Sequence, residues 1–292
     1  RRVLFRSQAH FSPCTPARQK HEHLKLLQGV SRSFHLSIRL LPQALQAPIA
    51  VGYLLARATD TVADTTTLPQ AERQALLDAM AHAIASPQPA TAALSAQAQA
   101  FAAQQKDPHE QALLRQIAPC LNALDHQPAA DQAAIRRVLA AITEGQRWDL
   151  AALDGPQAGV QTEAELSRYT WLVAGCVGEF WTDVCEGHLR NWRRAEVSEL
   201  RGWGAQYGMG LQRLNIVRDA GADLTQGRCY WPTERLSVQG LTPESLTQAV
   251  HEARLDARQP LAGPGRHHSG QPKSARRRYL ARCQRQAEWR IL

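Results

Sequence analysis

The chain has 292 residues, and Ala, Leu, Gln, Arg and Glu dominate its composition. These residues favour helices and no sustained alternation of Val, Ile and Thr is present, so the composition argues against a β protein and predicts an all-α fold with a sizeable core. The formal net charge of +8 comes from the ends, because residues 21–250 carry 19 basic and 23 acidic side chains. A mildly acidic body without a basic stripe argues against nucleic-acid binding.

The two ends of the chain differ from this body. Residues 1–19 have no signal-peptide core and are predicted to be a disordered or non-native lead. Residues 256–292 are basic with little to bury, so we expect a disordered or truncated tail, and a native tail that contacts anionic lipid is the alternative. Residues 20–255 are predicted to form one all-α domain.

No run of apolar residues is long enough to span a membrane. The uncharged stretch Leu40–Ala56 is interrupted by Pro42, Pro48 and two glutamines. The six cysteines are scattered and form no C-x-x-C motif, which predicts neither a disulfide framework nor a zinc site. The sequence therefore indicates a cytoplasmic protein, with peripheral contact to the inner membrane face as an open alternative.

The segment from residue 21 to residue 42 predicts two short helices. The second, in SRSFHLSIRLLP, can be capped by Ser31 or Ser33 and is ended by Pro42. A basic residue beside hydroxyls at a helix start can also hold phosphate oxygens. Simple capping is the alternative.

The stretch PIAVGYLLARATDTVADT, which begins at Pro48, predicts a largely buried helix. Its polar residues are spaced by four, three and four positions and share one face: Tyr53, Arg57, Asp60 and Asp64. Apolar residues fill the other directions: Val51, Leu54, Leu55, Ala58 and Val62. Two carboxylates one turn apart on such a helix indicate a site for a hard cation.

The middle of the chain predicts outer helices with solvated charges. Residues 68–103 are rich in Ala and Gln, and residues 87–99 are predicted to be a loop or flexible link. Two helices are expected to follow, His109–Ala123 and Pro128–Leu150. We expect Asp149 to be an ordinary solvated charge, because its spacing pairs it with no other ligand.

The stretch LSRYTWLVAGCVGEFWTDV predicts a helix that presents Tyr169 and Phe180 on one face. Gly175 and Gly178 permit close backbone approach beside that face. A tyrosine in an apolar pocket can stabilise a cation with its ring or move a proton with its hydroxyl. A core tyrosine with a satisfied hydroxyl is the alternative.

The stretch GMGLQRLNIVRDAGADLTQGRCYWP predicts a second helix with a polar stripe, at spacings of four, three, four and four: Gly208, Gln212, Asn215, Asp219 and Asp223. The apolar residues on another face should anchor the helix in the core: Leu211, Leu214 and Val217. Arg218 adds positive charge, and the helix break at Gly227 and Pro232 brings Arg228 close.

The two helices with D-x-x-x-D pairs are expected to face each other across a pocket. Cations would lie between the carboxylates, and arginines would hold an anionic substrate. Solvated surface carboxylates are the alternative for either pair taken alone.

Four motifs over about residues 24–250 resemble the squalene and phytoene synthases, the head-to-head trans-isoprenyl diphosphate synthases. They are SRSF, YLLARATDTVAD, YTWLVAGCVG and QRLNIVRDAGAD with GRCYWP. The third motif and the YWP ending look closer to bacterial squalene synthases. The resemblance implies a single-domain isoprenoid-synthase helical bundle with a central cavity for two prenyl diphosphates.

The resemblance also implies roles for individual residues. Mg²⁺ would be held by residues that also act in catalysis: Asp60, Asp64, Asp219 and Asp223. Substrate would be bound by Ser31, Arg32, Phe34, Tyr53, Arg57, Gln212, Asn215, Arg218 and Arg228. Tyr169 would act in the first half-reaction, and the pocket walls would include Phe34, Phe180 and Trp181.

The implied reaction joins two farnesyl diphosphates into presqualene diphosphate and then squalene. NADPH for the reductive step is implied by the resemblance alone, because no G-x-G-x-x-G motif follows a strand. A phytoene or dehydrosqualene synthase of the same fold is the first alternative. The second is a non-catalytic prenyl-lipid binding protein, which would have no use for four convergent carboxylates.

Overall fold

The helices of the bundle are seen in a computed structural model, which describes residues 25–31, 34–86, 92–152 and 159–258. Their bounds are α2 Phe34–Leu40, α3 Gln43–Asp64, α4 Gln70–Ala85, α5 Ala92–Ala102, α6 Pro108–Arg115, α7 Ile117–Asp125, α8 Ala129–Ala152, α9 Glu163–Thr170, the π-helix η1 Trp171–Gly175, α10 Cys176–His188, α11 Val197–Thr225, α12 Thr233–Val238 and α13 Pro243–Arg258. No strand occurs among these residues, and the prediction of an all-α fold is confirmed.

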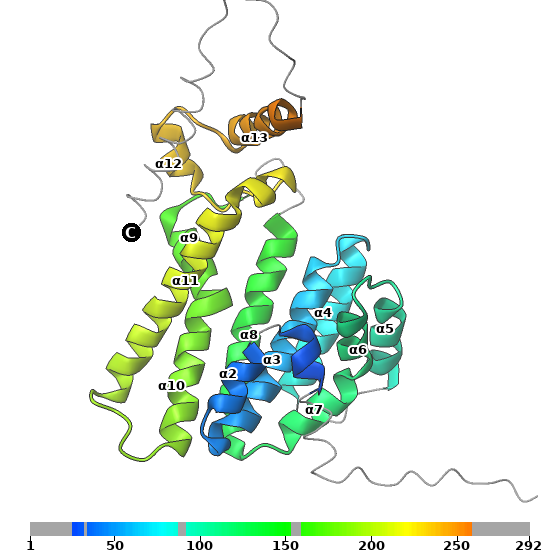
Figure 1. The fold of residues 1–292 in the computed structure, drawn as a ribbon, viewed down its shortest axis with the longest axis vertical. Coiled ribbons are helices and arrows are strands. Elements are labelled where there is room, and N and C mark those ends of the chain that lie inside the picture. The colour runs from blue at the N-terminus through cyan, green and yellow to red at the C-terminus, as the bar shows by residue number, and fades with distance from the viewer. Residues whose placement is uncertain (1–24, 32–33, 87–91, 153–158, 259–292) are drawn as a thin grey trace, which may run out of the picture.

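The helix α3 lies in the middle of the bundle. It contacts α8 along its length, with α4, α6 and α7 on one side and α10 on the other (Figure 1). Its predicted apolar face is fully buried, since Leu54, Leu55, Ala58 and Val62 are at most 1% exposed. This core therefore fixes the direction in which the polar face of α3 points.

Three helix boundaries differ from the sequence predictions. The helix α3 begins at Gln43 rather than Pro48, because Pro42 provides the N-terminal start and the buried Pro48 is accepted inside the helix. Residues 92–99, predicted within a loop, belong to α5, because Leu94 and Phe101 bury a helical face. The helix predicted from residue 109 to 123 is interrupted at Gln116, which separates α6 from α7.

Glycines allow α11 to cross α10 and η1 at very short distance. A Cβ atom at Gly178 would lie 1.9 Å from the carbonyl oxygen of Gly204, and one at Gly208 would lie 2.3 Å from that of Ala174. Only residues without a side chain fit there. The prediction of close backbone approach at Gly178 is confirmed, and this crossing positions the polar stripe of α11.

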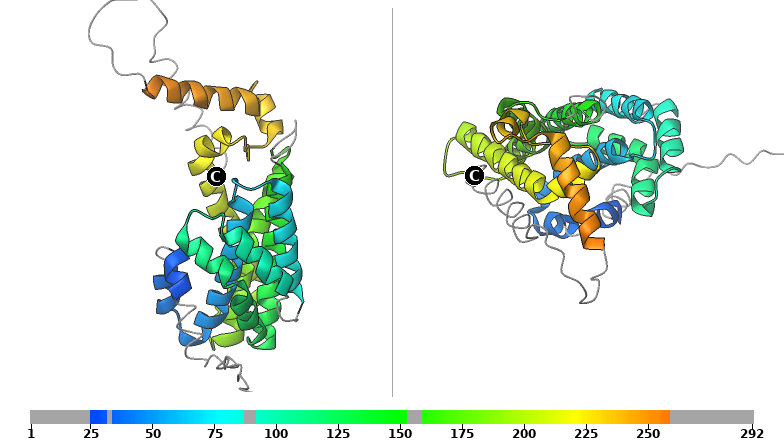
Figure 2. Two further views of the ribbon diagram at one scale, coloured as in Figure 1. Left: turned by 90° about the vertical axis from the view of Figure 1, so that its right-hand side faces the viewer. Right: turned by 90° about the horizontal axis from the view of Figure 1, so that it is seen from above.

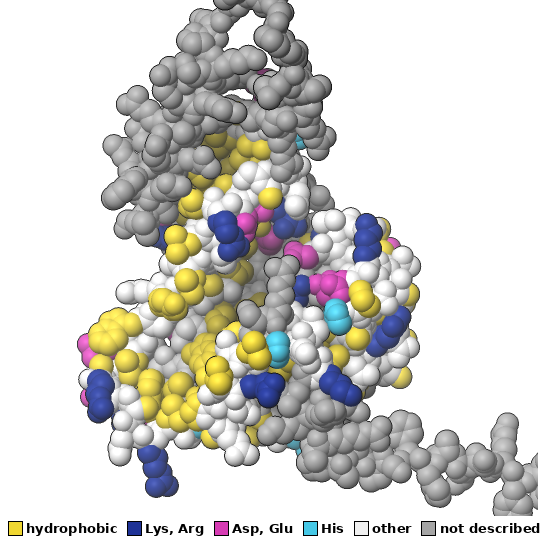
Figure 3. All heavy atoms as spheres, in the orientation of Figure 1, with side chains coloured by type: hydrophobic (Ala, Val, Ile, Leu, Met, Phe, Trp, Pro, Cys, Tyr) yellow, Lys and Arg dark blue, Asp and Glu magenta, His cyan; other side chains and the backbone are white. Residues whose placement is uncertain are grey.

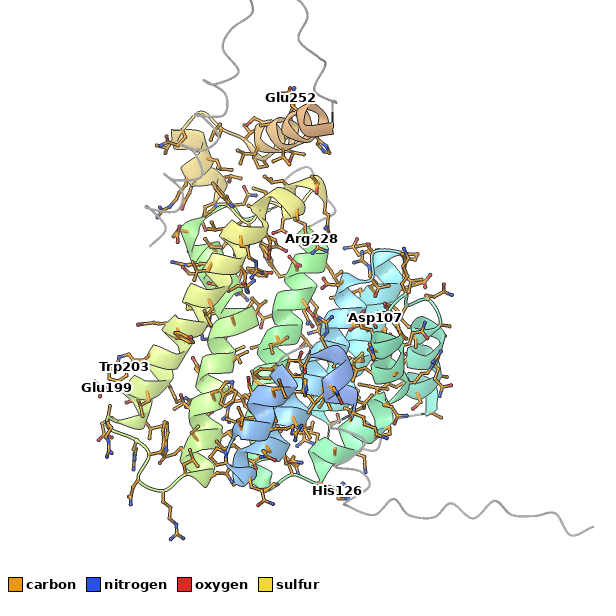
Figure 4. All side chains as sticks on the ribbon, viewed as in Figure 1. Asp107, His126, Glu199, Trp203, Arg228 and Glu252 are labelled. Carbon is orange, nitrogen blue, oxygen red and sulfur yellow. The ribbon has the colours of Figure 1, made fainter. Side chains whose placement is uncertain are left out.

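The apolar side of α11 is not buried in the described part of the chain. Leu211 and Leu214 are 45% and 53% exposed, so the prediction that they anchor the helix in the core is wrong for these residues. Trp203 and Tyr207 extend the same exposed stripe, and Trp203 projects from the outer side of α11 (Figure 4). The reason is that α11 packs through its glycine face, and the leucines lie on a different side.

The helices α12 and α13 lie beyond the end of the bundle at which α11 terminates (Figure 2). They pack on the end of α11 through a small separate cluster that includes Leu224, Cys229 and Leu236. None of the described helices is long and apolar enough to cross a membrane. The predicted lead over residues 1–19 and the part of the tail after Arg258 lie outside the described residues.

Candidate active site

The two D-x-x-x-D pairs lie at the ends of α3 and α11. Arg228, in the segment that follows α11, connects them, because its Nη1 atom is 3.9 Å from Oδ1 of Asp64. Its backbone N–H donates to the carbonyl of Asp223 at 2.9 Å. The expectation that the two helices face each other is therefore met at Arg228, which lies between the ends of α11 and α8 (Figure 4).

Arg57 on α3 is held by two carboxylates. Its Nη1 donates to Oδ2 of Asp60 at 2.6 Å, and its Nη2 donates to Oε1 of Glu110 on α6. Glu110 had no predicted role, because only the packing of α6 against α3 brings it to this site. Such a clamp orients the guanidinium before any substrate arrives.

The pKa of Asp60 is well above its ordinary value. Burial raises the pKa of Asp60 to about 6, and the charge of Asp64 adds to this while Arg57 opposes it. The side chain still exposes 42% of its surface, so the carboxyl lies in a recess that is crowded by protein and open on one side. A partly desolvated carboxyl beside a second one favours a bound cation, which would offset the repulsion.

The carboxylates of α11 lie in unlike surroundings. Arg218 holds Asp219 with two hydrogen bonds, Nε to Oδ1 at 2.9 Å and Nη2 to Oδ2 at 2.6 Å, and these lower the pKa of Asp219. Burial raises the pKa of Asp223, which Arg228 opposes. The charges of Asp219 and Asp64 raise it further, so carboxylates from both helices are within electrostatic reach of one another.

Asp149, expected to be solvated, belongs to this site. The hydroxyl of Tyr230 donates to its Oδ1, and its Oδ2 lies 3.9 Å from Nη1 of Arg228. Burial raises the pKa of Asp149 above its ordinary value. The prediction was wrong because α8 runs alongside α3, so its last turns end beside Asp64 and Arg228.

Tyr169 lies in an aromatic group next to these charges. Its ring stacks on that of Tyr230, with centroids 5.1 Å apart and an interplanar angle of 17°, and is 5.0 Å from that of Trp148. The residue is buried, and this burial raises the pKa of Tyr169 far above the usual value, with the charge of Asp149 adding to it. A raised pKa keeps the hydroxyl neutral near neutral pH, where it can donate a hydrogen bond but is not a phenolate base.

A π-helical turn begins two residues after Tyr169. The element η1, Trp171–Gly175, widens the chain between α9 and α10 and makes room for the close contact with α11. Such turns are rare and often mark functional sites. The sequence carried no sign of it apart from the glycine at its end.

Ser31 caps the helix α2, as the alternative of simple capping predicted. Its Oγ donates to the carbonyl of Leu27 and accepts from the N–H of His35 at 3.0 Å. The ring of Phe34 lies 4.9 Å from that of Tyr53 on α3. Arg32, predicted to bind diphosphate, lies outside the described residues.

The other predicted site residues divide between α11 and the core. Gln212 and Asn215 share the polar face of α11, where Nδ2 of Asn215 donates to Oε1 of Gln212 at 3.3 Å. Phe180 is buried against Gly52 of α3, and Trp181 packs on the same core. These two aromatic residues therefore support α10, and a role as pocket walls stays a prediction.

The carboxylates fit Mg²⁺ as two pairs rather than as a closed cage. Among the described residues, no three His, Cys, Asp or Glu side chains lie close enough to hold a metal by themselves. Mg²⁺ is usually bound through one or two carboxylates together with substrate phosphates and water. In each pair one charge raises the pKa of its neighbour, that of Asp64 the pKa of Asp60 and that of Asp219 the pKa of Asp223, and such paired carboxylates match that mode of binding.

The charged side chains gather beside an apolar surface. Figure 3 shows acidic and basic groups between the end of α11 and the region of α4 and α6, with apolar side chains below them between α11 and α2. A small hollow at the end of α11 combines both kinds of group, since Asp223, Arg228, Tyr230 and Trp231 line it. Charged and apolar groups thus adjoin at this end of the bundle, as a ligand with an anionic headgroup and an apolar chain would require.

Comparison with known proteins agrees with this geometry. The family model described as squalene/phytoene synthase matches residues 27–289. The chain is 30% identical to the presqualene diphosphate synthase of Zymomonas mobilis subsp. mobilis, over 77% of this chain and 64% of the relative. It is 30% identical to a squalene synthase of Gibberella zeae (76% and 45%) and 27% identical to the 15-cis-phytoene synthase of Synechocystis sp. (83% and 64%). The chain thus spans less than two-thirds of the length of these relatives.

Two solved structures show the same fold. They are titled as complexes of TcSQS, one with the ligand E5700 and one with BPH1237, and their TM-scores are 0.56 and 0.57. Their sequences are 23% and 22% identical to this one. The matches cover 73% and 82% of this chain and 58% and 66% of those chains. The chain belongs to the squalene/phytoene synthase family and has its all-α isoprenoid-synthase fold.

Proposed function

We propose that this protein is a Mg²⁺-dependent prenyltransferase that joins two farnesyl diphosphates head to head into presqualene diphosphate, which NADPH then reduces to squalene. The observation that carries the proposal is the position of Arg228. Its guanidinium lies 3.9 Å from Asp64, and two residues further on Tyr230 stacks on Tyr169. A diphosphate site is thus continuous with a buried aromatic group.

The charged side of this site suits the departure of a diphosphate. Arg57, Arg218 and Arg228 each lie beside an aspartate, which orients them toward an anion held between α3 and α11. When bound, Mg²⁺ supplies further positive charge for the leaving group. Fixed charges of this kind act most strongly on the charge that develops as the bond to diphosphate breaks.

The aromatic side suits the cation that remains. An allylic cation is attracted to the faces of aromatic rings, and Tyr169, Tyr230 and Trp148 present three rings beside the charged groups. Because these residues are buried or half-buried, they also keep water from the cation. Forming presqualene diphosphate from two farnesyl diphosphates releases one diphosphate and one proton. An oxygen of the released diphosphate would take up this proton, and the neutral Tyr169 hydroxyl would lie next to that step as a hydrogen-bond donor.

A synthase that makes phytoene or dehydrosqualene is the second candidate. It is favoured by the similarity to the phytoene synthase of Synechocystis sp., which is nearly as high as the similarity to the presqualene diphosphate synthase. The two candidates differ in the donor, C15 or C20, or in the use of NADPH. Both require the same charged and aromatic groups.

The test is product formation from each donor. The protein is incubated with farnesyl or geranylgeranyl diphosphate, with and without Mg²⁺ and NADPH, and products are identified by mass. We expect presqualene diphosphate from farnesyl diphosphate and Mg²⁺ alone. Phytoene from the C20 donor would favour the second candidate. Binding of farnesyl diphosphate without any product would indicate the non-catalytic lipid-binding alternative.

A further inference from the structure

Asp149 connects the two halves of the site. It lies near the end of α8, and its side chain is 19% exposed. Its Oδ1 atom accepts the hydrogen bond from the hydroxyl of Tyr230, and its Oδ2 atom lies 3.9 Å from Nη1 of Arg228. The two oxygens of one carboxylate thus face one aromatic and one cationic group.

Arg228 is held by charge on two sides. Its side chain is 13% exposed, and Nη1 is 3.9 Å from both Oδ1 of Asp64 and Oδ2 of Asp149. This separation is an ion pair without a direct hydrogen bond. The guanidinium is therefore centred between two carboxylates, while its N–H groups are not taken up by these carboxylates and can bind an anion.

Tyr230 is fixed at both ends of its side chain. The hydroxyl is bound to Asp149, and the ring is stacked on that of Tyr169. A displacement of the Tyr230 hydroxyl would shift the ring and, with it, the surface against which Tyr169 rests. The orientation of Tyr169 therefore depends on Asp149 through Tyr230.

The backbone of this segment is set by other contacts. The N–H of Arg228 donates to the carbonyl of Asp223, and the carbonyl of Cys229 accepts from the N–H of Val160 at 3.1 Å. These bonds place the main chain but leave the directions of both side chains open. Asp149 contacts both of those side chains.

We propose that Asp149 is a positioning residue, which fixes Arg228 for the diphosphate and Tyr230, and through it Tyr169, for the prenyl cation. This inference rests on the proposed function. The carboxylate of Asp149 acts through Arg228 and Tyr230. It differs in this from the aspartates of α3 and α11, which face the cation site. The distance between the charged half and the aromatic half of the site is then set by the side chain of Asp149 on α8.

Three variants separate the two contacts. In Asp149→Asn the amide oxygen can still accept from Tyr230, but the charge beside Arg228 is lost. In Tyr230→Phe the hydrogen bond is lost and the charge stays. Asp149→Ala removes both contacts. Asp78→Asn is the matched control. Asp78 lies on α4 and pairs at 2.6 Å, on the outer face, with Arg147, which is on the same helix α8 as Asp149.

Loss of the charge and loss of the hydrogen bond should affect different kinetic constants. We expect Asp149→Asn to raise KM for farnesyl diphosphate about tenfold, since a displaced Arg228 binds the headgroup less well. Tyr230→Phe should lower kcat about tenfold with KM little changed, because the hydrogen bond that holds its ring against Tyr169 is missing. Asp149→Ala should show both changes, about a hundredfold in kcat/KM. Asp78→Asn should behave as the wild type.

Two readouts do not depend on turnover. Calorimetry with Mg²⁺ and inorganic pyrophosphate should show about tenfold weaker binding for Asp149→Ala. Near-ultraviolet circular dichroism should show a changed tyrosine signal, since the stack of Tyr230 on Tyr169 is loosened. An inactive wild type would refute the proposed function, and these two readouts would still test the role of Asp149.

Other results would overturn the inference. One is Asp149→Ala with wild-type kcat/KM, pyrophosphate binding and tyrosine signal. Another is a parallel loss of all constants and of thermal stability in every variant, because that pattern would describe a structural contact only. Should Asp149→Ala fail to fold, Asp149→Asn and Tyr230→Phe carry the test through the split between KM and kcat.

Discussion

Arg228 and Asp64 meet at 3.9 Å although 164 positions separate them in the chain. This ion pair joins the segment after α11 to the last residue of α3. It brings the two carboxylate pairs to one place, beside the aromatic group around Tyr169.

The carboxylates of both helices should be needed for turnover. We expect Asp60→Asn and Asp219→Asn each to lower turnover by at least about a hundredfold, because each removes a carboxylate ligand of the Mg²⁺ that stabilises the leaving diphosphate. Far-ultraviolet circular dichroism should show unchanged helicity, and Asp78→Asn on the outer face should keep its activity. Wild-type rates in both site variants would contradict the assignment of the site.

Asp60→Asn should also make the protein more stable without metal. The pKa of Asp60 is raised to about 6, so the folded state is penalised for ionising this group. The penalty is complete above pH 6 and shrinks as the pH falls toward the ordinary value of 3.8. Since the carboxyl is partly open to solvent, we expect a gain of about 1 kcal/mol, or about 2–4 °C in Tm, at pH 8.

The measurement is thermal unfolding in EDTA at pH 8 and at pH 5, with Asp78→Asn as control. The gain for Asp60→Asn should be smaller at pH 5. An equal or lower Tm at pH 8 would show that the ionised carboxylate is not strained in the folded protein.

Removal of metal should abolish turnover and leave the fold intact. The helices that carry the aspartates are held by the apolar core of α3 and by the glycine crossing of α11, not by a cation. We therefore expect EDTA to stop product formation without changing helicity, and added Mg²⁺ to restore it. Full activity in EDTA would refute the requirement for a metal.

The crossing of α10 and α11 should not accept a methyl group. In Gly178→Ala the new Cβ would lie 1.9 Å from the carbonyl oxygen of Gly204, so the helices must separate. Such overpacking costs about 1–3 kcal/mol or more, which lowers Tm by roughly 5–10 °C. Gly187→Ala and Gly202→Ala are the matched controls on the same two helices, because a Cβ atom there meets nothing within 4 Å.

The two controls should unfold at or slightly above the wild-type temperature, since alanine is the better helix former. A wild-type Tm for Gly178→Ala would mean that the helices are not in contact at this point. Activity measured at a temperature where all variants are folded should also fall for Gly178→Ala, because the polar stripe of α11 is displaced.

The sequence by itself determined what depends on spacing along a single helix. A period of 3.6 residues put Arg57, Asp60 and Asp64 on one face and the buried apolar residues of α3 on the others, as the structure shows. Composition sufficed for the all-α class. The motifs sufficed for the family, because they are local runs of residues in a defined order.

Only the tertiary structure decided which helices meet and at what distance. Asp149 looked like a surface charge and Glu110 had no predicted role, since nothing near them in the sequence reveals that α8 ends beside Arg228 or that α6 packs against Arg57. Leu211 and Leu214 looked like core residues, since their pattern shows an apolar face but not whether another element covers it. Contacts between helices depend on their crossing, which residues distant in the chain determine together.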